Sequence, residues 1–301
     1  MHAPTQAISR SAFITLLLLA CLFGANHVAA RFAFNHGVDV ATAVTVRSLV
    51  TCLVVALVVW QQGVRWAINP RQRRVMLGVS SLIAIQSLCL YSAVARLPVA
   101  LALLAFNTYP LWTAMWDAVL YRRVPERAVL LAMPLLLAGL ALALDVVGAA
   151  SGLTASEQWG RIGAGVAFAL TAGASFGAAM VLTQHEAAGV DGRVRTVISM
   201  GLVGVFAAVA VAAQGGLHLP TAAAGWWGLA CLTLFYGTAF SIMFTLLPKL
   251  GVVGSSPIMN VEPVAALVLA WALLDQRIAP LQVAGALLVV GTVMALGLRK
   301  K

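Results

Sequence analysis

The sequence predicts an all-α membrane protein with ten transmembrane helices, arranged as two inverted five-helix repeats. Three observations predict this fold class. The chain of 301 residues is 62% hydrophobic and only 9% charged, whereas a soluble domain is about a quarter charged. Apolar runs long enough to cross a membrane recur along the chain. Short motifs in the first half return in the second half at a nearly constant offset.

The apolar runs have the length that an α-helix needs to cross a bilayer, about 20 residues. They lie at 11–30, 40–61, 75–95, 98–120, 128–147, 162–186, 195–214, 223–247, 254–274 and 280–298. Turn signals such as Asn69-Pro70 and Gly215-Gly216 separate several of them. Because most connections are short, we expect successive helices to be antiparallel neighbours.

The positive charges indicate how the chain is oriented. Most of the 19 Lys and Arg residues fall in alternate loops, for example Arg71, Arg73 and Arg74 after the second run. The positive-inside rule then places both termini in the cytoplasm. The expected location of the protein is the inner membrane. The net charge of +10 does not indicate nucleic-acid binding, because the charges line no single helix face.

The N-terminal apolar run and the cysteines each allow a further interpretation. Arg10, the apolar run after it and Val28-Ala29-Ala30 also fit a cleaved signal peptide, although cleavage would remove one member of the repeat. The four cysteines lie inside apolar runs without a C-x-x-C spacing. No metal, disulfide or cofactor is therefore expected.

The repeat is the strongest internal signal. Phe23-Gly24-Ala25 returns as Phe176-Gly177-Ala178, and Asn107-x-x-Pro110 returns as Asn260-x-x-Pro263, both after 153 residues. Coincidence among glycine- and alanine-rich helices is the alternative. If the halves are 1–150 and 151–301 with five spans each, the second enters the membrane from the opposite side. Such inverted repeats recur in secondary transporters, where they surround a central site.

These motifs resemble the drug/metabolite transporter superfamily, in its ten-helix EamA branch. The resemblance rests on Phe23-Gly24-Ala25-Asn26, Arg47, the two Asn-x-x-Pro motifs, Val261-Glu262-Pro263 and the closing Gln282-x-x-Gly285. Within that branch the chain resembles aromatic amino acid exporters of the YddG type. The resemblance implies export of small organic solutes, first of all amino acids, and the repeat suggests alternating access as the mechanism. Nucleotide sugars, drugs and other metabolites are the alternative substrates.

The chain departs from the family at two places. The family often carries a glutamate directly after the fourth and ninth spans, where this sequence has Arg123 and Gln276. This departure weakens any closer subfamily assignment.

Two charged residues are candidates for substrate binding. Arg47 lies inside the second span, where a central arginine costs about 2.5–3.5 kcal/mol on insertion scales and should face the bundle. It either contacts a carboxylate or phosphate or extends to a headgroup. Glu262 precedes Pro263 in the ninth span and either binds an ammonium group or proton, or pairs structurally with a neighbouring helix.

The Asn-x-x-Pro motifs predict a kink or a hinge within each of two spans. Pro110 and Pro263 each remove a backbone donor, and Asn107 and Asn260 are placed to satisfy the freed carbonyls. Symmetry-related hinges and static kinks are the two interpretations. Asp117, further along the fourth span, shares a polar stripe with Asn107. It either faces a cavity or another helix, or is an interfacial carboxylate near Arg122 or Arg123, which we favour.

Aromatic and amide side chains complete the candidate site. Tyr91, Tyr109 and Trp112 could line an apolar wall for bulky solutes, and Gln86 is a further polar candidate. No ATP-binding G-x-x-x-x-G-K-[ST] motif occurs. A membrane enzyme would need a motif such as H-E-x-x-H, and a receptor would have longer loops. The expected partners are a small solute and the bilayer; proton coupling, flux direction and oligomeric state are left open.

Overall fold

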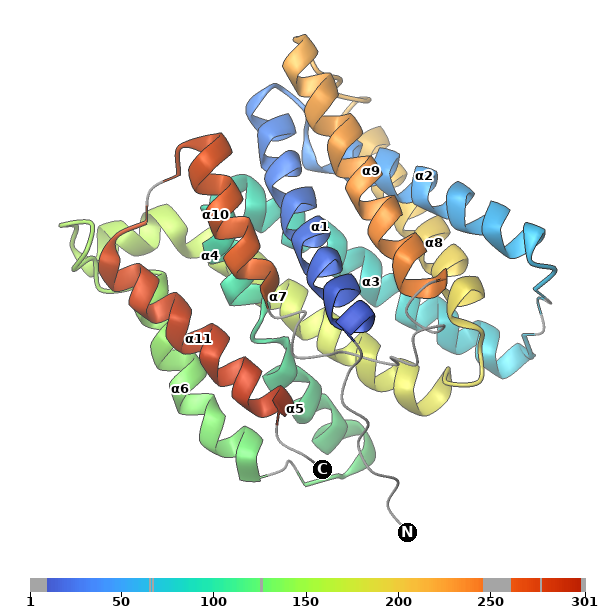
Figure 1. Cartoon of the computed structure of the whole chain (residues 1–301), viewed down its shortest axis with the longest axis horizontal. Coiled ribbons are helices and arrows are strands. Elements are labelled where there is room, and N and C mark those ends of the chain that lie inside the picture. Colours follow the sequence, from blue (N-terminus) through green and yellow to red (C-terminus); the bar gives the residue numbers. More distant parts are fainter. Residues whose placement is uncertain are drawn as a thin grey trace.

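The structure, a computed structural model, describes residues 10–64, 66, 68–124, 127–245, 261–276 and 278–298. These residues form α-helices and no strands, which confirms the all-α class (Figure 1). The helices are α1 (Arg10–Asn35), α2 (Val40–Gln61), α3 (Pro70–Arg96), α4 (Val99–Phe106), α5 (Tyr109–Tyr121), α6 (Arg127–Ala143), α7 (Ala155–Glu186), α8 (Gly192–Ala213), α9 (Ala223–Thr245), α10 (Glu262–Leu274) and α11 (Pro280–Leu298).

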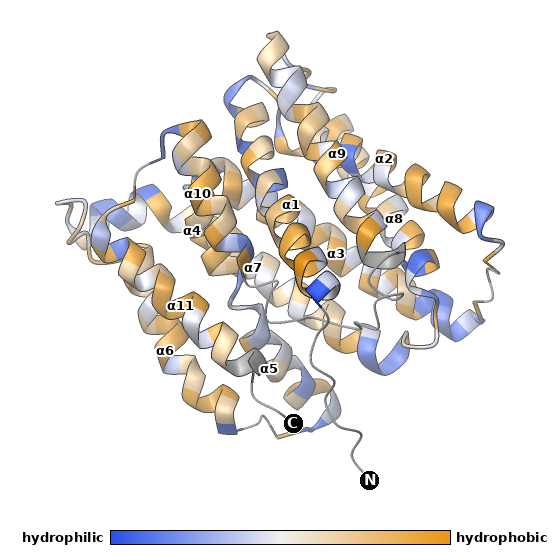
Figure 2. Cartoon of the chain, viewed as in Figure 1, coloured by the Kyte–Doolittle hydropathy of each residue, from blue (hydrophilic) through white to orange (hydrophobic). Residues whose placement is uncertain are grey.

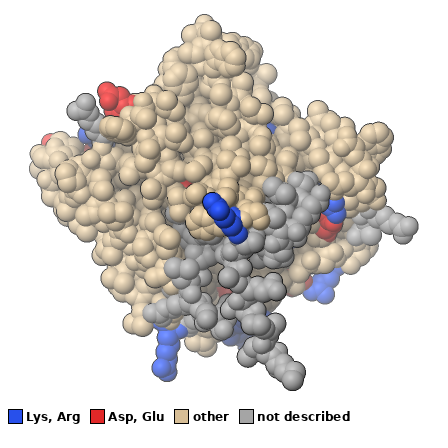
Figure 3. Space-filling view, in the orientation of Figure 1, with Lys and Arg blue, Asp and Glu red and all other residues tan. Residues whose placement is uncertain are grey.

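Apolar helices dominate the bundle. Six segments are long and apolar enough to cross a membrane, namely α1, α2, α3, α4 together with α5, α7 and α8. The helices α6, α10 and α11 are shorter apolar segments, and α9 is an apolar helix of 23 residues. Hydrophobic residues predominate along the helices and polar ones gather near their ends (Figure 2). Uncharged side chains cover most of the face in Figure 3. The total of ten spans stays a prediction.

The predicted span at 98–120 is broken, so it is not one continuous helix. α4 ends at Phe106 and α5 begins at Tyr109, with Pro110 in the first turn of α5. Side chains at the break satisfy the backbone. The Asn107 amide donates to the Leu103 carbonyl at 2.9 Å, and the Thr108 hydroxyl donates to the Ala105 carbonyl at 2.7 Å. α10 likewise begins with Pro263 in its first turn, whereas Asn260 lies outside the described residues.

Helices from the two halves of the chain pack mainly on each other. α3 packs along α7 and α1 along α9, while α5 lies against α7 and α1 against α10. α2 pairs with α8 and α6 with α11. If α1, α3 and α5 are exchanged for α7, α9 and α10, the first four pairings exchange among themselves. The core therefore sits where the two halves meet.

Two close helix–helix contacts are related by the same sequence offset as the repeated motifs. A Cβ atom on Gly24 would lie 3.0 Å from the Ala266 nitrogen of α10, and one on Gly177 would lie 2.8 Å from the Thr113 nitrogen of α5. Both members of the second contact lie 153 positions from their counterparts in the first. The residues that end α5 and α10, Arg122 and Asp275, both have left-handed backbones, with φ of 55° and 52°.

A buried aspartate organises the segment between the halves. Asp145 is 3% exposed, and its carboxylate accepts the backbone N–H groups of Ala150 at 2.9 Å and Ser151 at 2.8 Å. Burial alone would raise the pKa of Asp145, but these hydrogen bonds outweigh it and hold the pKa below its usual value.

Replacing this carboxylate should loosen the connection. We expect Asp145→Asn to cost about 1–3 kcal/mol, because two backbone N–H groups lose a charged acceptor whose side chain is buried. Since the folded pKa is lowered, the wild-type contribution is complete above the unfolded value of about 3.9 and is lost as pH falls through the folded pKa. Thermal unfolding in detergent from pH 7 to pH 3 measures this, and an equally steep acid loss in Asp145→Asn would contradict it.

Candidate functional site

A buried arginine lies at the centre of a polar cluster in the bundle. Arg47 of α2 is 2% exposed. Its guanidinium carbon lies 3.8 Å from the ring centre of Tyr236 on α9 and 4.7 Å from that of Tyr91 on α3. It also donates to the Tyr91 hydroxyl and the Ser87 hydroxyl, each at 3.3 Å. The side chain therefore stays inside the bundle and does not reach a headgroup.

The cluster continues from Tyr91 to a carboxylate on the other side. The Tyr91 hydroxyl donates to the Asn26 side-chain oxygen at 3.0 Å, and the His27 ring centre lies 5.4 Å from that of Tyr91. The His27 Nε2 atom is 3.4 Å from the Glu262 carboxylate, whose side chain is 20% exposed. We call the following set the polar cluster: Asn26, His27, Arg47, Ser87, Tyr91, Tyr236 and Glu262.

Several buried atoms in and beside the polar cluster have no hydrogen-bond partner among the described residues. They are Asn26 Nδ2, His27 Nδ1, Arg47 Nε and Ser48 Oγ. Among the described residues, no carboxylate oxygen lies within 4.0 Å of the Arg47 guanidinium. A buried unpaired polar group costs about 1–3 kcal/mol. The site therefore has donor capacity for an acceptor-bearing ligand, with an acid close by.

Local sequence explains how these groups are positioned. Ser87 and Tyr91 are four residues apart, so they share one face of α3. Glu262 begins α10, where the helix dipole favours a negative charge. Asp39 fixes the start of α2 by accepting the Thr42 N–H at 2.8 Å. Arg47 lies two turns further along that helix.

The direct contacts of the predicted site residues fall into two groups. Arg47, Tyr91 and Glu262 come together, and Gln86 lies at the edge, where its side-chain oxygen accepts from the Ser87 hydroxyl at 3.4 Å. Sequence reasoning missed Ser87. Its one signal was the shared helix face with Tyr91.

Tyr109 and Trp112 form the second group, at the junction of α4, α5 and α7. The Tyr109 ring centre lies 5.1 Å from that of Phe176 and 5.7 Å from that of Phe106. The Trp112 indole N–H donates to the Thr108 hydroxyl at 3.3 Å. Pro110 sits between these two aromatic residues, next to the break.

Asp117 has a different partner from the expected arginines. Its carboxylate lies 2.9 Å from the His185 Nε2 atom, and the His185 ring stacks on Tyr121 at 3.9 Å between centres. Glu186 accepts from Tyr121 at 3.3 Å and from Arg71 at 2.7 Å. These contacts tie the ends of α5 and α7 to the start of α3. Arg122 ends the helix in a left-handed conformation.

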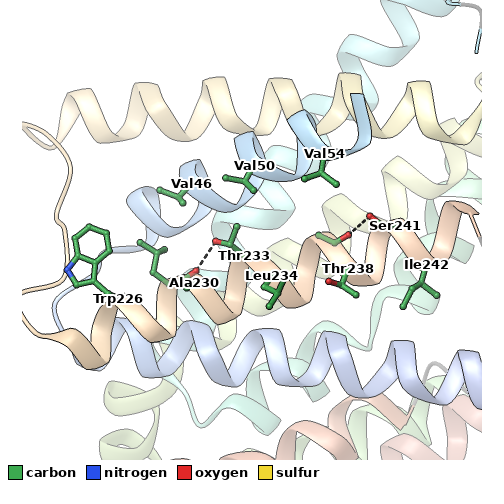
Figure 4. Close-up of a pocket in the computed structure, with 12 residues that line it drawn as sticks. Val46, Val50, Val54, Trp226, Ala230, Thr233, Leu234, Thr238, Ser241 and Ile242 are labelled. Carbon is green, nitrogen blue, oxygen red and sulfur yellow. Dashed lines mark hydrogen bonds between the residues drawn. The ribbon is translucent and has the colours of Figure 1, made fainter. Parts of the chain in front are cut away.

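A groove between α2 and α9 has a different character (Figure 4). It encloses about 590 Å³, and Val46, Val50 and Val54 of α2 face α9 across it. Two hydroxyls on its α9 side, Thr233 and Ser241, donate to carbonyls of their own helix. The groove lining is thus apolar, as expected for a surface in contact with lipid.

These features define a polytopic α-helical membrane protein with a polar site buried among helices of both halves. The sequence matches the EamA-like transporter family over residues 10–144 and again over 163–298. The chain therefore belongs to the EamA-like transporter family, whose members transport small solutes across membranes. This confirms the resemblance to the EamA branch and the transporter class, and the closer resemblance to YddG-type exporters stays a prediction.

The other comparisons add the fold. No curated protein matches the chain. One solved structure, titled "Crystal structure of protein", matches with a TM-score of 0.62 and 17% identity, over 95% of this chain and 96% of its own. At that identity the likeness shows the fold alone.

Proposed function

We propose that this protein exports amino acids, aromatic ones included, across the inner membrane, and that the polar cluster binds them. The observation that carries the proposal is that a buried cation, Arg47, contacts Tyr91, and that an acid, Glu262, is reached from the same tyrosine through His27. Tyr91 accepts from Arg47 and lies beside His27, which contacts Glu262. A solute carboxylate would take the unpaired donors at Arg47 and Asn26, and its ammonium group would face Glu262.

Alternating access around this cluster is the proposed mechanism. The exchangeable helix pairs and the matched contacts of Gly24 and Gly177 support two inverted repeats of five spans. A histidine–carboxylate pair also lies at each end of the bundle, where it could take part in gating. His185 meets Asp117 at one end, and His218 meets Asp39 at the other, at 2.7 Å. Pro110 and Pro263 are the proposed hinges, and the Lys and Arg distribution supports cytoplasmic termini.

Reconstituted protein tests the proposal. In liposomes we expect wild-type protein to move labelled aromatic amino acids, and Glu262→Gln to reduce the initial rate by about tenfold or more, because a neutral amide loses the charged contact to the ammonium. Glu157→Gln is the matched control, since Glu157 is exposed at the start of α7. Repeating the assay with and without a pH gradient tests proton coupling.

The outcome separates the alternatives. Uptake of nucleotide sugars without any amino acid would overturn the proposed substrate and keep the transporter class. Equal rates for wild type and Glu262→Gln would remove Glu262 from the site.

A further inference from the structure

A second cavity lies where α2 ends and α3 begins. It encloses about 450 Å³ and is lined by Trp66, Ile68, Arg73, Met76, Leu77 and Ile198. We call it the α3 pocket. It takes its lining from the α2–α3 connection, the first turns of α3 and one residue of α8. None of these residues belongs to the polar cluster.

Positive charge gathers around this pocket. The start of α3 carries Arg71, Arg73 and Arg74 and has no acidic residue in its first turn. Arg71 pairs with Glu186 at 2.7 Å. Within the described chain, Arg73 and Arg74 have no carboxylate within 4.0 Å. The pocket therefore presents a cation, Arg73, that no carboxylate of the described residues neutralises.

The rest of the lining is apolar and partly open. Trp66 and Leu77 are each 55% exposed, and tryptophan is enriched at the level of lipid headgroups. Met76, 1% exposed, provides a buried wall. A free phosphate would satisfy Arg73 but would leave these apolar surfaces uncovered. A phospholipid would place its phosphate on the arginine and its acyl chain against Leu77 and Ile198.

We propose that the α3 pocket binds an anionic phospholipid of the phosphatidylglycerol or cardiolipin class. Charge complementarity selects the headgroup, and the apolar walls select a lipid over a soluble anion. The bound lipid would link the α2–α3 connection to α8. This inference does not depend on which solute the polar cluster binds.

Matched variants test the proposal. Purified full-length protein in neutral detergent is titrated with phosphatidylglycerol, phosphatidylcholine or inorganic phosphate, and bound lipid is counted by native mass spectrometry. We expect phosphatidylglycerol adducts on the wild type, and about fivefold weaker binding for Arg73→Gln. Arg74→Gln removes the same charge from the same turn but does not line the pocket, so it should bind nearly as the wild type. Leu77→Trp should fill the pocket and weaken binding with no change in charge.

Each other outcome overturns the site. Equal losses in Arg73→Gln and Arg74→Gln would mean general attraction to a basic surface. Equal retention of phosphatidylcholine would remove headgroup selection, and competition by inorganic phosphate at the lipid's concentration would mean an anion site. Melting temperatures measured without added lipid show whether each variant is folded. Because the Arg73 side chain is exposed, Arg73→Gln should melt at the same temperature as the wild type in the absence of lipid.

Discussion

Arg47→Lys is expected to lower transport by about tenfold or more, although the positive charge is kept. The guanidinium donates to Tyr91 and Ser87 at once and also lies over two tyrosine rings. A lysine ammonium is a compact point charge that cannot reproduce this planar set of contacts. Hydrogen bonds to charged groups contribute about 1.5–3 kcal/mol each, and about 1.4 kcal/mol is a factor of ten. Initial rates in proteoliposomes measure the effect.

A second measurement separates solute binding from support of the fold. If Arg47 holds the solute carboxylate, Arg47→Lys raises KM while the melting temperature in detergent stays near that of the wild type. If it mainly joins α2, α3 and α9, the melting temperature falls. Arg161→Lys is the control, because Arg161 is exposed on α7. Transport by Arg47→Lys within twofold of the wild type would show that the polar cluster is not needed.

The sequence predicted what depends on composition and local pattern. It predicted the helices, because lipid demands long apolar segments whose backbone groups pair internally. It predicted that Arg47 avoids lipid, because an arginine facing hydrocarbon is costly, but it left a contact inside the bundle and extension to a headgroup as alternatives. It also found the Asn107 and Pro110 motif, but not that the helix would stop there. That outcome depends on Thr108, whose hydroxyl satisfies a carbonyl at the break.

Contacts between distant helices could not be predicted in the same way. Arg47 contacts Tyr236 only if α2 and α9 are each rotated about their own axes so that these two faces meet. A helix that is apolar on all sides does not show in its sequence which face packs against a neighbour. Asp117 shows the same limit. Arg122 and Arg123 are near in sequence, but His185 arrives from α7 across the interface. The 153-residue repeat was the one sequence feature that related distant contacts, because a contact made by a residue of one half is expected again at the equivalent residues of the other half.

The repeat also predicts that alanine at either of two equivalent glycines, Gly24 and Gly177, destabilises the protein. Gly177→Ala is expected to destabilise the protein by about 1–3 kcal/mol, because the new methyl group would lie 2.8 Å from the Thr113 nitrogen and 2.9 Å from the Trp112 Cβ atom. α7 would have to move away from α5. Gly24→Ala should act in the same direction, since its methyl group would lie 3.0 Å from backbone atoms of Ala266 and Glu262 on α10. Thermal unfolding in detergent and the yield of folded protein measure both.

Gly160→Ala provides the control on the same helix as Gly177. No atom lies within 4 Å of its added Cβ, so alanine should be neutral or stabilise α7 by up to about 1 kcal/mol through its higher helix propensity. Opposite signs at two glycines of one helix would show that close packing, and not glycine itself, sets the effect. If the close contacts matter equally in both halves, Gly24→Ala and Gly177→Ala should each lower transport. Loss in one with a wild-type rate in the other would argue against two equivalent repeats moving around the polar cluster.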